Sequence, residues 1–361
     1  MGLIDAMIGL GEAIEAARKP LPQPVSASLW KPSVDIVIPT HRGRFEKGKP
    51  TWGLHLTIES CEADLKNSGI DYRYYIVSNG NPQTGDERDS LNMAFDFAEK
   101  TGRVGKIFDT PEAMAPPNAR NLGVRAGTGE VLFFFDDHIK VHPGFFQGSL
   151  DTMHRTGCAA VFGPLVHSKT GARQYHHAMR EFLADYFWAG MCLLPANPLQ
   201  PYRIASGNHG AFCIRRSDFQ EVGCYWEGFT GWAGEEPELN LKLWMMDKEI
   251  YFTPHISHWH FFADRRYKRD ARQTALNQMM VANIIGGKKW AARIANNVFA
   301  HQLKTIAPDD RETIREREKT VLELYDKALA KSAEQARWMQ EHRKRTLEEQ
   351  LALFEREGVA M

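Results

Sequence analysis

Short apolar runs and helically spaced apolar residues alternate along most of the chain. A short run of mostly apolar residues predicts a buried strand of a sheet. The runs that predict strands are residues 34–38, 74–77, 105–108, 131–135 and 211–214. Apolar residues three and four positions apart predict helices at residues 52–65, 90–100, 118–126 and 237–246. Strands that alternate with helices predict an α/β fold with a mostly parallel, doubly wound central sheet.

After about residue 262 the character of the sequence changes, and residues 309–354 are charge-dense with helical spacing. Between Asp309 and Phe354 an apolar stripe lies along one helix face, formed by Ile314, Val321, Leu322, Tyr325, Leu329, Leu347, Leu351 and Phe354. Such a stripe packs on the body of the protein or on another subunit. We therefore expect residues 263–361 to form a helical C-terminal extension, through which the protein can form a homo-oligomer.

The N-terminal segment has the spacing of an amphipathic helix, with apolar positions Leu3, Ile4, Met7, Ile8 and Ile14. Acidic residues interrupt it and no positive region precedes it, which argues against a signal peptide. A helix that docks on the protein is favoured over a membrane-surface anchor, which would carry more Lys and Arg. Residues 19–32 contain four prolines and read as a linker. The expected domains are therefore residues 1–32, 33–262 and 263–361.

The composition is that of an ordinary globular protein, with 43% hydrophobic and 25% charged residues. The 45 basic and 45 acidic residues cancel, so no global field points to nucleic acid. No stretch approaches the roughly 20 apolar residues that a membrane span needs. The five cysteines, Cys61, Cys158, Cys192, Cys213 and Cys224, are scattered and lack CxxC spacing. This pattern favours reduced thiols and a cytoplasmic protein, and leaves open whether the protein attaches peripherally to a membrane.

The most informative run is Phe-Phe-Phe-Asp-Asp-His at residues 133–138, an apolar strand that ends in two carboxylates and an imidazole. Open α/β sheets bind their ligands beyond the carboxyl ends of the strands. Carboxylate oxygens with one imidazole suit Mn²⁺ or Mg²⁺, and these cations suit a diphosphate. The alternative interpretation is a strand followed by an acidic turn.

Four segments taken in order resemble a glycosyltransferase of the family-2 type with the GT-A fold. The first is the strand and loop of residues 34–41, and the second runs from Pro-Asn-Ala-Arg-Asn at 117–121 into the Asp-Asp-His run. The third is Ser-Gly-Asn-His-Gly-Ala-Phe at 206–212 with the residues up to 223. The fourth, residues 231–239, is similar to the family's Trp-Gly-Gly-Glu-Asp box. The resemblance implies a metal-dependent enzyme that transfers a sugar from a nucleotide-sugar donor, with UDP as the expected nucleotide.

Two positions depart from the usual family pattern. His138 stands where an aspartate is common, and this Asp-x-His variant is the pattern of the polypeptide N-acetylgalactosaminyltransferases. The second strand ends in Ser78-Asn79, where the family often has two aspartates that contact the base. The identity of the nucleotide base is therefore left open.

The resemblance also assigns residues to the donor site. It implies that Asp136 and His138 bind the metal, that Asp137 faces the ribose or donor sugar, and that Arg120 lies near the diphosphate. The expected donor-binding residues are Pro39, Thr40, His41, Arg42, Asn79, Arg120, Asp137, Asn208, His209 and Trp232. Trp226 and Trp232 are expected to form walls of the acceptor pocket, with core packing as the alternative for both.

A histidine-rich segment, Pro-His-Ile-Ser-His-Trp-His at residues 254–260, resembles the place where GT-A enzymes supply one more metal ligand. His258 and His260 are two positions apart, so on an extended segment both face the same side. Either is capable of reaching the metal, and the spacing does not choose between them.

Glu235 and Glu236 follow a glycine and open a predicted helix, a place that acidic residues favour for the helix dipole alone. An inverting transferase also needs a general base for the acceptor hydroxyl. By resemblance Glu236 is that base, and Glu235 binds donor or acceptor hydroxyls. The retaining enzymes that share the His138 pattern carry an amide at the position of Glu236, so the carboxylate favours inversion. In a retaining enzyme Glu236 would bind the acceptor instead.

The acceptor is not defined by the sequence and is a glycan, a protein, a small molecule or modified DNA. Basic residues at 265–269 and 288–289 favour a DNA-modifying enzyme of the phage type, and solvated helix faces explain them equally well. A further alternative is a homologue that binds sugar nucleotides without catalysis. The retained Asp136, His138, Glu235 and Glu236 argue against it.

Overall fold

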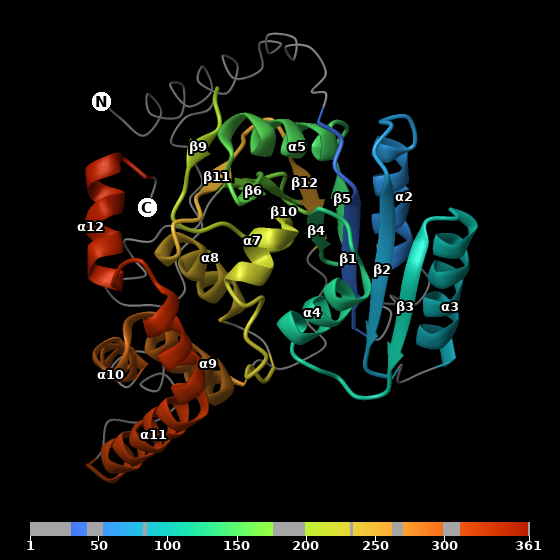
Figure 1. Cartoon of the computed structure of the whole chain (residues 1–361). Coiled ribbons are helices and arrows are strands. Elements are labelled where there is room, and N and C mark those ends of the chain that lie inside the picture. The colour runs from blue at the N-terminus through green and yellow to red at the C-terminus, as the bar shows by residue number, and fades with distance from the viewer. Residues whose placement is uncertain are drawn as a thin grey trace, which may run out of the picture.

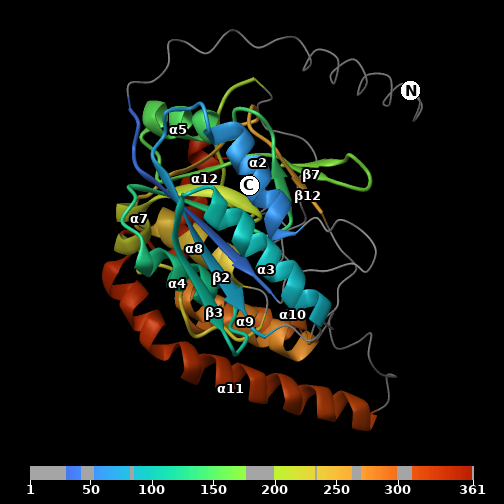
Figure 2. The same ribbon diagram turned by 90° about the vertical axis from the view of Figure 1, so that its right-hand side faces the viewer.

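The computed structural model describes residues 30–41, 53–81, 85–175, 199–231, 234–261, 270–298 and 311–359. Within these ranges the chain forms a large twisted sheet with helices on both faces, and further helices pack beside it (Figures 1 and 2). The predicted α/β class, the mostly parallel central sheet and the helical C-terminal region are confirmed. The predicted N-terminal helix lies outside the described residues. Among the described helices, none combines the length and apolar character needed to cross a membrane.

The main sheet has eight strands in the described part of the chain, in the order β3-β2-β1-β4-β10-β6-β11-β9. The strands are β1 Val34–Thr40, β2 Tyr72–Asn79, β3 Val104–Thr110, β4 Val131–Phe135, β6 Ala160–Phe162, β9 Tyr202–Arg203, β10 Ala211–Arg215 and β11 Ile250–Phe252. β3, β2, β1 and β4 are parallel, and β10 is antiparallel to both of its neighbours. All five strands that the sequence predicts are present.

The triple phenylalanine of β4 contributes to hydrophobic cores on both faces of the sheet. Successive side chains of a strand point to opposite faces of the sheet. Phe133 therefore packs on Phe146 on one face, with ring centroids 4.6 Å apart. Phe134 packs on Phe212 on the other face, with centroids 5.2 Å apart. Burial on both faces explains why this strand has no polar alternation.

Six helices of the described chain cover the sheet. One face is covered by α2 Leu54–Leu65, α3 Gly85–Lys100 and α5 Phe145–Thr156, and the other by α4 Pro116–Ala126, α7 Arg216–Glu221 and α8 Glu235–Met245. α4 lies very close to β1, because a Cβ atom added to Gly123 would come within 2.6 Å of the Cγ1 atom of Val37. This close packing brings the N-terminal half of α4 to the carboxyl end of the sheet.

The close approach at Gly123 leads to a stability prediction. Gly123→Ala should lower the free energy of unfolding by about 1–3 kcal/mol, because the added methyl group overpacks the contact with Val37. Gly85→Ala at the start of α3 is the matched control, since an added Cβ there meets nothing within 4 Å. Chemical denaturation of both variants measures the difference, and equal stability of the two would contradict the close packing of α4.

A second sheet, with four strands among the described residues, lies beside the end of β4. Its strands, in the order β5-β12-β7-β8, are β5 Ile139–Val141, β12 His258–His260, β7 Leu165–His167 and β8 Arg173–Gln174. Thr57 on α2 fixes β5, since its hydroxyl donates to the carbonyl of Ile139 at 3.0 Å and accepts from its N–H at 3.2 Å. β12 pairs with β5 antiparallel, with His260 opposite Ile139 and His258 opposite Val141. This register decides which histidine lies near the end of β4.

The C-terminal helices are α9 Ala271–Gly286, α10 Lys288–Asn297, α11 Arg311–His342 and α12 Leu347–Glu357. The predicted stripe between residues 309 and 354 is divided between α11 and α12. A new helix begins after Thr346, which forms a capping box with Glu349, the hydroxyl accepting from the Glu349 N–H at 3.2 Å. Phe354 of α12 packs against Trp244 of α8, with ring centroids 5.0 Å apart. The core on this side of the sheet thus continues across the predicted domain boundary at residue 262.

α9 also holds the loop that precedes α8. The side-chain amide of the buried Asn277 donates to the carbonyl oxygen of Thr230 at 3.0 Å. Gly234, the residue before α8, has φ +103°, and a Cβ atom added to it would meet Phe229 at 2.9 Å and Val281 of α9 at 3.1 Å. The glycine therefore permits both the turn and the close approach of α9 at the start of α8.

Candidate functional site

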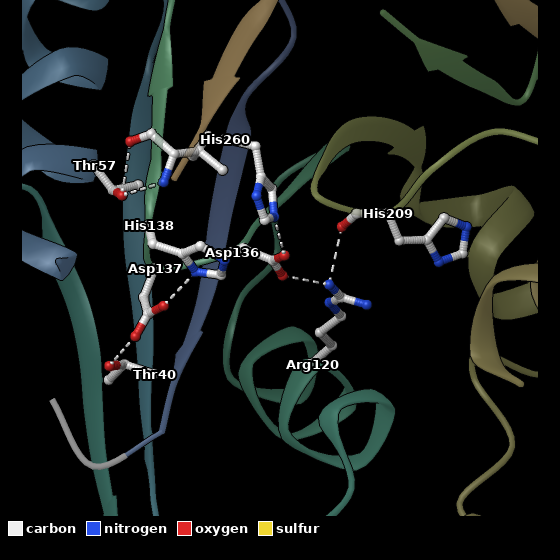
Figure 3. Close-up of polar contacts among 9 residues, drawn as sticks. Thr40, Thr57, Arg120, Asp136, Asp137, His138, His209 and His260 are labelled. Atoms are coloured by element: carbon white, nitrogen blue, oxygen red, sulfur yellow. Dashed lines mark hydrogen bonds and ion pairs between the residues drawn. The ribbon is translucent and has the colours of Figure 1, made fainter. Parts of the chain in front are cut away.

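The candidate site lies at the carboxyl end of β4 (Figure 3). The N–H of Asp136 donates to the carbonyl oxygen of Gly210 at 2.9 Å, which holds the end of β4 beside the start of β10. The following residues, Asp137 and His138, are buried and lead into β5. Residues from α4, β4, β12 and the segment before β10 meet at this point, as the sequence patterns predict for an open α/β sheet.

Asp136, His138 and His260 form a group that is capable of holding a metal ion. Each offers one carboxylate oxygen or ring nitrogen, and these atoms all lie within 4.8 Å of one another. The Nε2 atom of His260 lies 3.3 Å from a carboxylate oxygen of Asp136. Although burial alone would raise the pKa of Asp136, it is lowered by the hydrogen bond from His260 and by the positive charge of Arg120.

Asp137 orients the imidazole of His138 and does not point into open space. One of its oxygens lies 2.8 Å from Nδ1 of His138, and the other accepts from the hydroxyl of Thr40 at 2.6 Å (Figure 3). Metal-binding histidines commonly donate their second ring N–H to a carboxylate in this way. In the structure the expected donor-binding side chains of Asp137 and Thr40 thus contact each other, and Asp137 also contacts His138.

The two late histidines occupy different environments. His260 belongs to the group with Asp136 and His138, and the N–H of the next residue, Phe261, donates to the carbonyl of His138 at 3.0 Å. His258 is fully buried, and its edge-on contact with Phe145 has a centroid distance of 6.2 Å. Burial lowers the pKa of His258 to about 3, so its ring is neutral. The register of β12 therefore brings His260, and not His258, into the group of metal-competent atoms.

Arg120 reaches the same point from α4. It is 3% exposed, and its Nη2 atom donates to Asp136 at 3.0 Å and to the carbonyl oxygen of His209 at 2.9 Å. The Nε and Nη1 atoms of this guanidinium are buried without a hydrogen-bond partner in the described structure. Buried N–H groups of a cation are rarely left in this state, so they indicate a site for an anion or for ordered water.

Glu235 and Glu236 stand at the N-terminus of α8, as predicted. Glu236 accepts a hydrogen bond from the N–H of His209 at 2.9 Å. Glu235 is buried, and its Oε2 atom has no hydrogen-bond partner among the described residues. Burial raises the pKa of both carboxyl groups to about 7, and the charge of Glu236 adds to the effect on Glu235. A carboxylate with a pKa near neutrality is suited to accept a proton at physiological pH.

Asn208 and His209, the two residues expected to bind the transferred sugar, differ in their hydrogen bonding. Both amide atoms of Asn208 are buried without a partner among the described residues, so this side chain retains its capacity to bind a polar ligand. The ring nitrogens of His209 are instead engaged by Tyr225 and Asn240. The residue contacts Arg120 and Glu236 through its backbone. Tyr225 and Asn240 were not singled out by the sequence, although Asn240 follows Glu236 by one helical turn.

The remaining predicted donor residues lie at the ends of β1 and β2. Pro39 is half-buried and His41 is exposed, with its Nδ1 atom 2.8 Å from the carbonyl oxygen of Asn79. The amide of Asn79 donates to the carbonyl of Met114 at 2.8 Å and accepts from its N–H at 2.7 Å. The side chain of Asn79 therefore fixes the segment before α4. Arg42 and Trp232 lie outside the described residues.

The comparison with known families identifies the class of protein. The profile of glycosyl transferase family 2 matches residues 35–223, which is more than half of the chain, and the protein belongs to this family. The matched region contains the ends of β1 and β4 and the whole of α4. The glutamates of α8 and the late histidines follow after it.

Among curated relatives, the chain is 30% identical over 207 residues to N-acetylgalactosaminyltransferase 6 of Drosophila melanogaster. It is 28% identical over 177 residues to polypeptide N-acetylgalactosaminyltransferase 5 of Caenorhabditis elegans. These matches cover 54% and 45% of this chain, but only 30% and 28% of the relatives. A crystal structure of GalNAc-T7 with UDP, GalNAc and Mn²⁺ shares the fold, with a TM-score of 0.58 and 17% identity over 81% of this chain and 55% of that one.

Proposed function

We propose that the protein transfers a sugar from a UDP-sugar to an acceptor hydroxyl in a reaction that depends on a divalent cation. The observation that carries this proposal is the position of Arg120, whose buried, unpartnered N–H groups adjoin the group of Asp136, His138 and His260. A diphosphate fits both the guanidinium of Arg120 and the metal-competent group, since its oxygens accept hydrogen bonds from the guanidinium and bind a cation. UDP is proposed as the nucleotide because the GalNAc-T7 structure that shares the fold contains UDP.

The donor set of the three residues fits Mn²⁺ or Mg²⁺. One carboxylate and two imidazoles suit Mn²⁺ in particular, because this ion accepts both oxygen and nitrogen ligands. The hydrogen bond of Asp137 to Nδ1 of His138 leaves Nε2 of that ring for a cation. When bound, the cation would neutralise charge on the diphosphate leaving group.

The side chains supply the remaining chemistry. Glu236 would remove the proton of the acceptor hydroxyl as its oxygen forms a bond to the anomeric carbon of the sugar. The bond from that carbon to the diphosphate breaks, and Arg120 stabilises the negative charge that the leaving group gains. Asn208 and Glu235, which carry buried polar atoms without partners, would bind hydroxyl groups of the transferred sugar. Attack from the side opposite the diphosphate inverts the anomeric configuration.

A panel of nucleotide sugars tests this proposal. The full-length protein should bind UDP by calorimetry only when Mn²⁺ or Mg²⁺ is present, and should hydrolyse or transfer from at least one UDP-sugar. NMR of the released or transferred sugar reports its anomeric configuration. Retained configuration would remove the base role of Glu236 and leave it as an acceptor-binding residue. Absence of both nucleotide binding and turnover with every donor would overturn the proposal and favour a homologue without catalysis.

The pKa of Glu236 predicts an acid limb in the pH profile. The base must be ionised to accept a proton, so kcat/KM should rise with pH and level off above about 7, the pKa to which burial raises this carboxyl group. Below that pH the rate should fall about tenfold per pH unit. The measurement is a pH profile of donor hydrolysis at saturating Mn²⁺. A flat profile between pH 5 and about 8 would be inconsistent with a base of this pKa.

The contact between Asp137 and His138 predicts an effect on metal affinity. Asp137→Ala should weaken Mn²⁺ binding about 10- to 100-fold, because His138 loses the carboxylate that orients its ring. Thr40→Val removes only the hydroxyl that donates to Asp137 and should have a smaller effect. Calorimetric titration with Mn²⁺ compares the two variants. A Kd for Asp137→Ala equal to that of the unaltered protein would show that the pair does not support a metal site.

The acceptor, the cellular location and the association state stay predictions. Of the two basic segments, only residues 288–289 are described, and the Nζ atom of Lys289 lies 3.5 Å from a carboxylate oxygen of Glu348. No feature of the described residues favours DNA over other acceptors. The four described cysteines are free, which supports a reducing, cytoplasmic setting. Leu322 of α11 is 62% exposed, a position compatible with the proposed contact between C-terminal helices of two copies.

A further inference from the structure

His209 connects the two halves of the proposed site through its backbone. Its N–H donates to a carboxylate oxygen of Glu236 at 2.9 Å, and its carbonyl oxygen accepts from Nη2 of Arg120 at 2.9 Å. One residue thus contacts both the proposed general base on α8 and the proposed diphosphate-binding arginine on α4. Any shift of this backbone segment would move hydrogen-bonding partners of both side chains.

The imidazole of His209 is held from two sides, and the hydrogen bonds define its tautomer. The amide nitrogen of Asn240 donates to the Ser206 hydroxyl at 2.9 Å and to the Gly207 carbonyl at 3.0 Å. The amide oxygen of Asn240 therefore faces Nε2 of His209, at 3.2 Å, and must accept from it. Nε2 carries the proton, which leaves Nδ1 as the acceptor.

Tyr225 supplies the hydrogen bond to that acceptor. Its hydroxyl oxygen lies 2.9 Å from Nδ1 of His209. Burial raises the pKa of Tyr225 far above its usual value, so the hydroxyl keeps its proton and donates it. The backbone of Tyr225 is in turn held by Asn121 of α4, which accepts from its N–H at 3.2 Å and donates to its carbonyl at 2.7 Å. Asn121 is the neighbour of Arg120 in the sequence. Tyr225 and His209 therefore form a continuous hydrogen-bond network between α4 and α8.

Aromatic packing restricts the same ring. His209 stacks on Phe212 with a centroid distance of 4.5 Å and on Phe162 with a centroid distance of 5.8 Å. The ring is 1% exposed with the rest of the residue, so it does not contact solvent. A buried imidazole with defined hydrogen bonds and stacked neighbours has one orientation, and this orientation sets the position of its backbone.

We propose that His209 is a positioning residue that couples Glu236 to Arg120, and that Asn240 and Tyr225 act on both through its ring. This inference rests on the proposed function for the roles of the two coupled residues. It assigns a purpose to three buried polar side chains that hydrogen-bond to one another. It also predicts that a change in one ring contact affects donor binding and the chemical step together.

His209→Phe tests the coupling, because phenylalanine preserves the stacking on Phe162 and Phe212 and removes both ring nitrogens. The Kd of UDP with Mn²⁺ should rise about tenfold and kcat of donor hydrolysis should fall about tenfold, because the ring loses its hydrogen bonds to Tyr225 and Asn240 and no longer holds the backbone that contacts Arg120 and Glu236. The acid limb of kcat/KM should move to higher pH, because the displaced N–H of residue 209 bonds Glu236 less well, and this hydrogen bond lowers the pKa of Glu236.

Asn240→Leu removes the hydrogen bond to Nε2 of His209 and should reproduce these changes. The double variant should be little worse than either single one, since both remove one network. Ser332→Ala is the matched control, because it removes a buried 2.9 Å hydrogen bond with Asn283 between α9 and α11. It should lower Tm without changing Kd, kcat or the pH profile. If His209→Phe likewise lowers Tm but leaves Kd, kcat and the pH profile unchanged, the ring serves only in packing and the proposed coupling is wrong.

Hydrogen exchange separates this inference from the proposed function. If the unaltered protein neither binds UDP with Mn²⁺ nor hydrolyses a donor, the proposed function fails, and the coupling is then judged by the His209 amide. In Asn240→Leu this amide should exchange at least about tenfold faster than in the unaltered protein, because its bond to Glu236 is no longer held in place. An unchanged exchange rate would overturn the coupling whether or not the protein binds a nucleotide.

Discussion

Asp136→Ala is expected to abolish turnover that depends on Mn²⁺ and to weaken Mn²⁺ binding beyond detection. Asp136 is the only carboxylate in the metal-competent group found among the described residues, and it also accepts a hydrogen bond from Arg120. Its loss leaves two neutral ligands for a divalent cation beside a buried guanidinium. Loss of several kcal/mol of charge stabilisation corresponds to a decrease in kcat of about a thousandfold or more.

The control for this variant is Asp64→Ala. Asp64 is a structural carboxylate that accepts from the N–H groups of Gly144 at 2.6 Å and Phe146 at 3.1 Å at the start of α5. Its removal should lower Tm and leave Mn²⁺ affinity unchanged. Calorimetric titration with Mn²⁺ and assays of donor hydrolysis compare the two. Normal metal-dependent turnover in Asp136→Ala would remove this residue from the metal site.

Glu236→Gln should depress the chemical step and spare donor binding. The amide keeps the size of the side chain and an oxygen that accepts from the His209 N–H, but it does not take up a proton. A lost general base lowers kcat by about 10²- to 10⁴-fold. The Kd of UDP with Mn²⁺ should stay within about twofold, since the contacts of Arg120 and the metal group are unchanged. The acid limb of the pH profile should disappear with the base.

Glu62→Gln provides the comparison for the same chemical change elsewhere. Glu62 accepts from the hydroxyl groups of Tyr72 and Tyr74 at 2.8–3.0 Å, on the face of the sheet that is covered by α2. This variant should keep both kcat and the acid limb. If Glu236→Gln turns over donor as fast as Glu62→Gln, the proton acceptor lies elsewhere in the protein.

The position of the proposed donor half of the site was predictable because its signals are local in the sequence. A buried strand that ends in Asp136-Asp137-His138 predicts both the sheet and a group of candidate metal ligands at its edge, and the glycine before Glu235 marks the start of a helix. The choice between His258 and His260 was not predictable, because it depends on the register of β12 against β5. Two residues along an extended strand change the position by about 7 Å, which exceeds the reach of an imidazole.

Side-chain roles that depend on partners distant in the sequence were also beyond prediction. The sequence assigns Asn79 and His209 to the donor, but the structure directs their side chains to Met114 and to Tyr225 and Asn240. Both are polar residues near conspicuous motifs, and local spacing does not show that a partner 31 or 35 residues away has engaged them. The second sheet was missed for a similar reason, since its strands are only two or three residues long.

The hydrogen bond from Asn277 to Thr230 bears on how this protein can be recombined with other members of its family. The loop ahead of α8 takes its shape from α9, which begins 48 residues after the family-matched segment ends at 223. A chimera that exchanged residues 35–223 alone would receive foreign donor motifs and keep the native loop, the native glutamates and the native helix behind them. A chimera that exchanged the segment from Thr230 through the end of α9 instead would replace the loop together with the helix that holds it, and would leave the end of β4 unchanged.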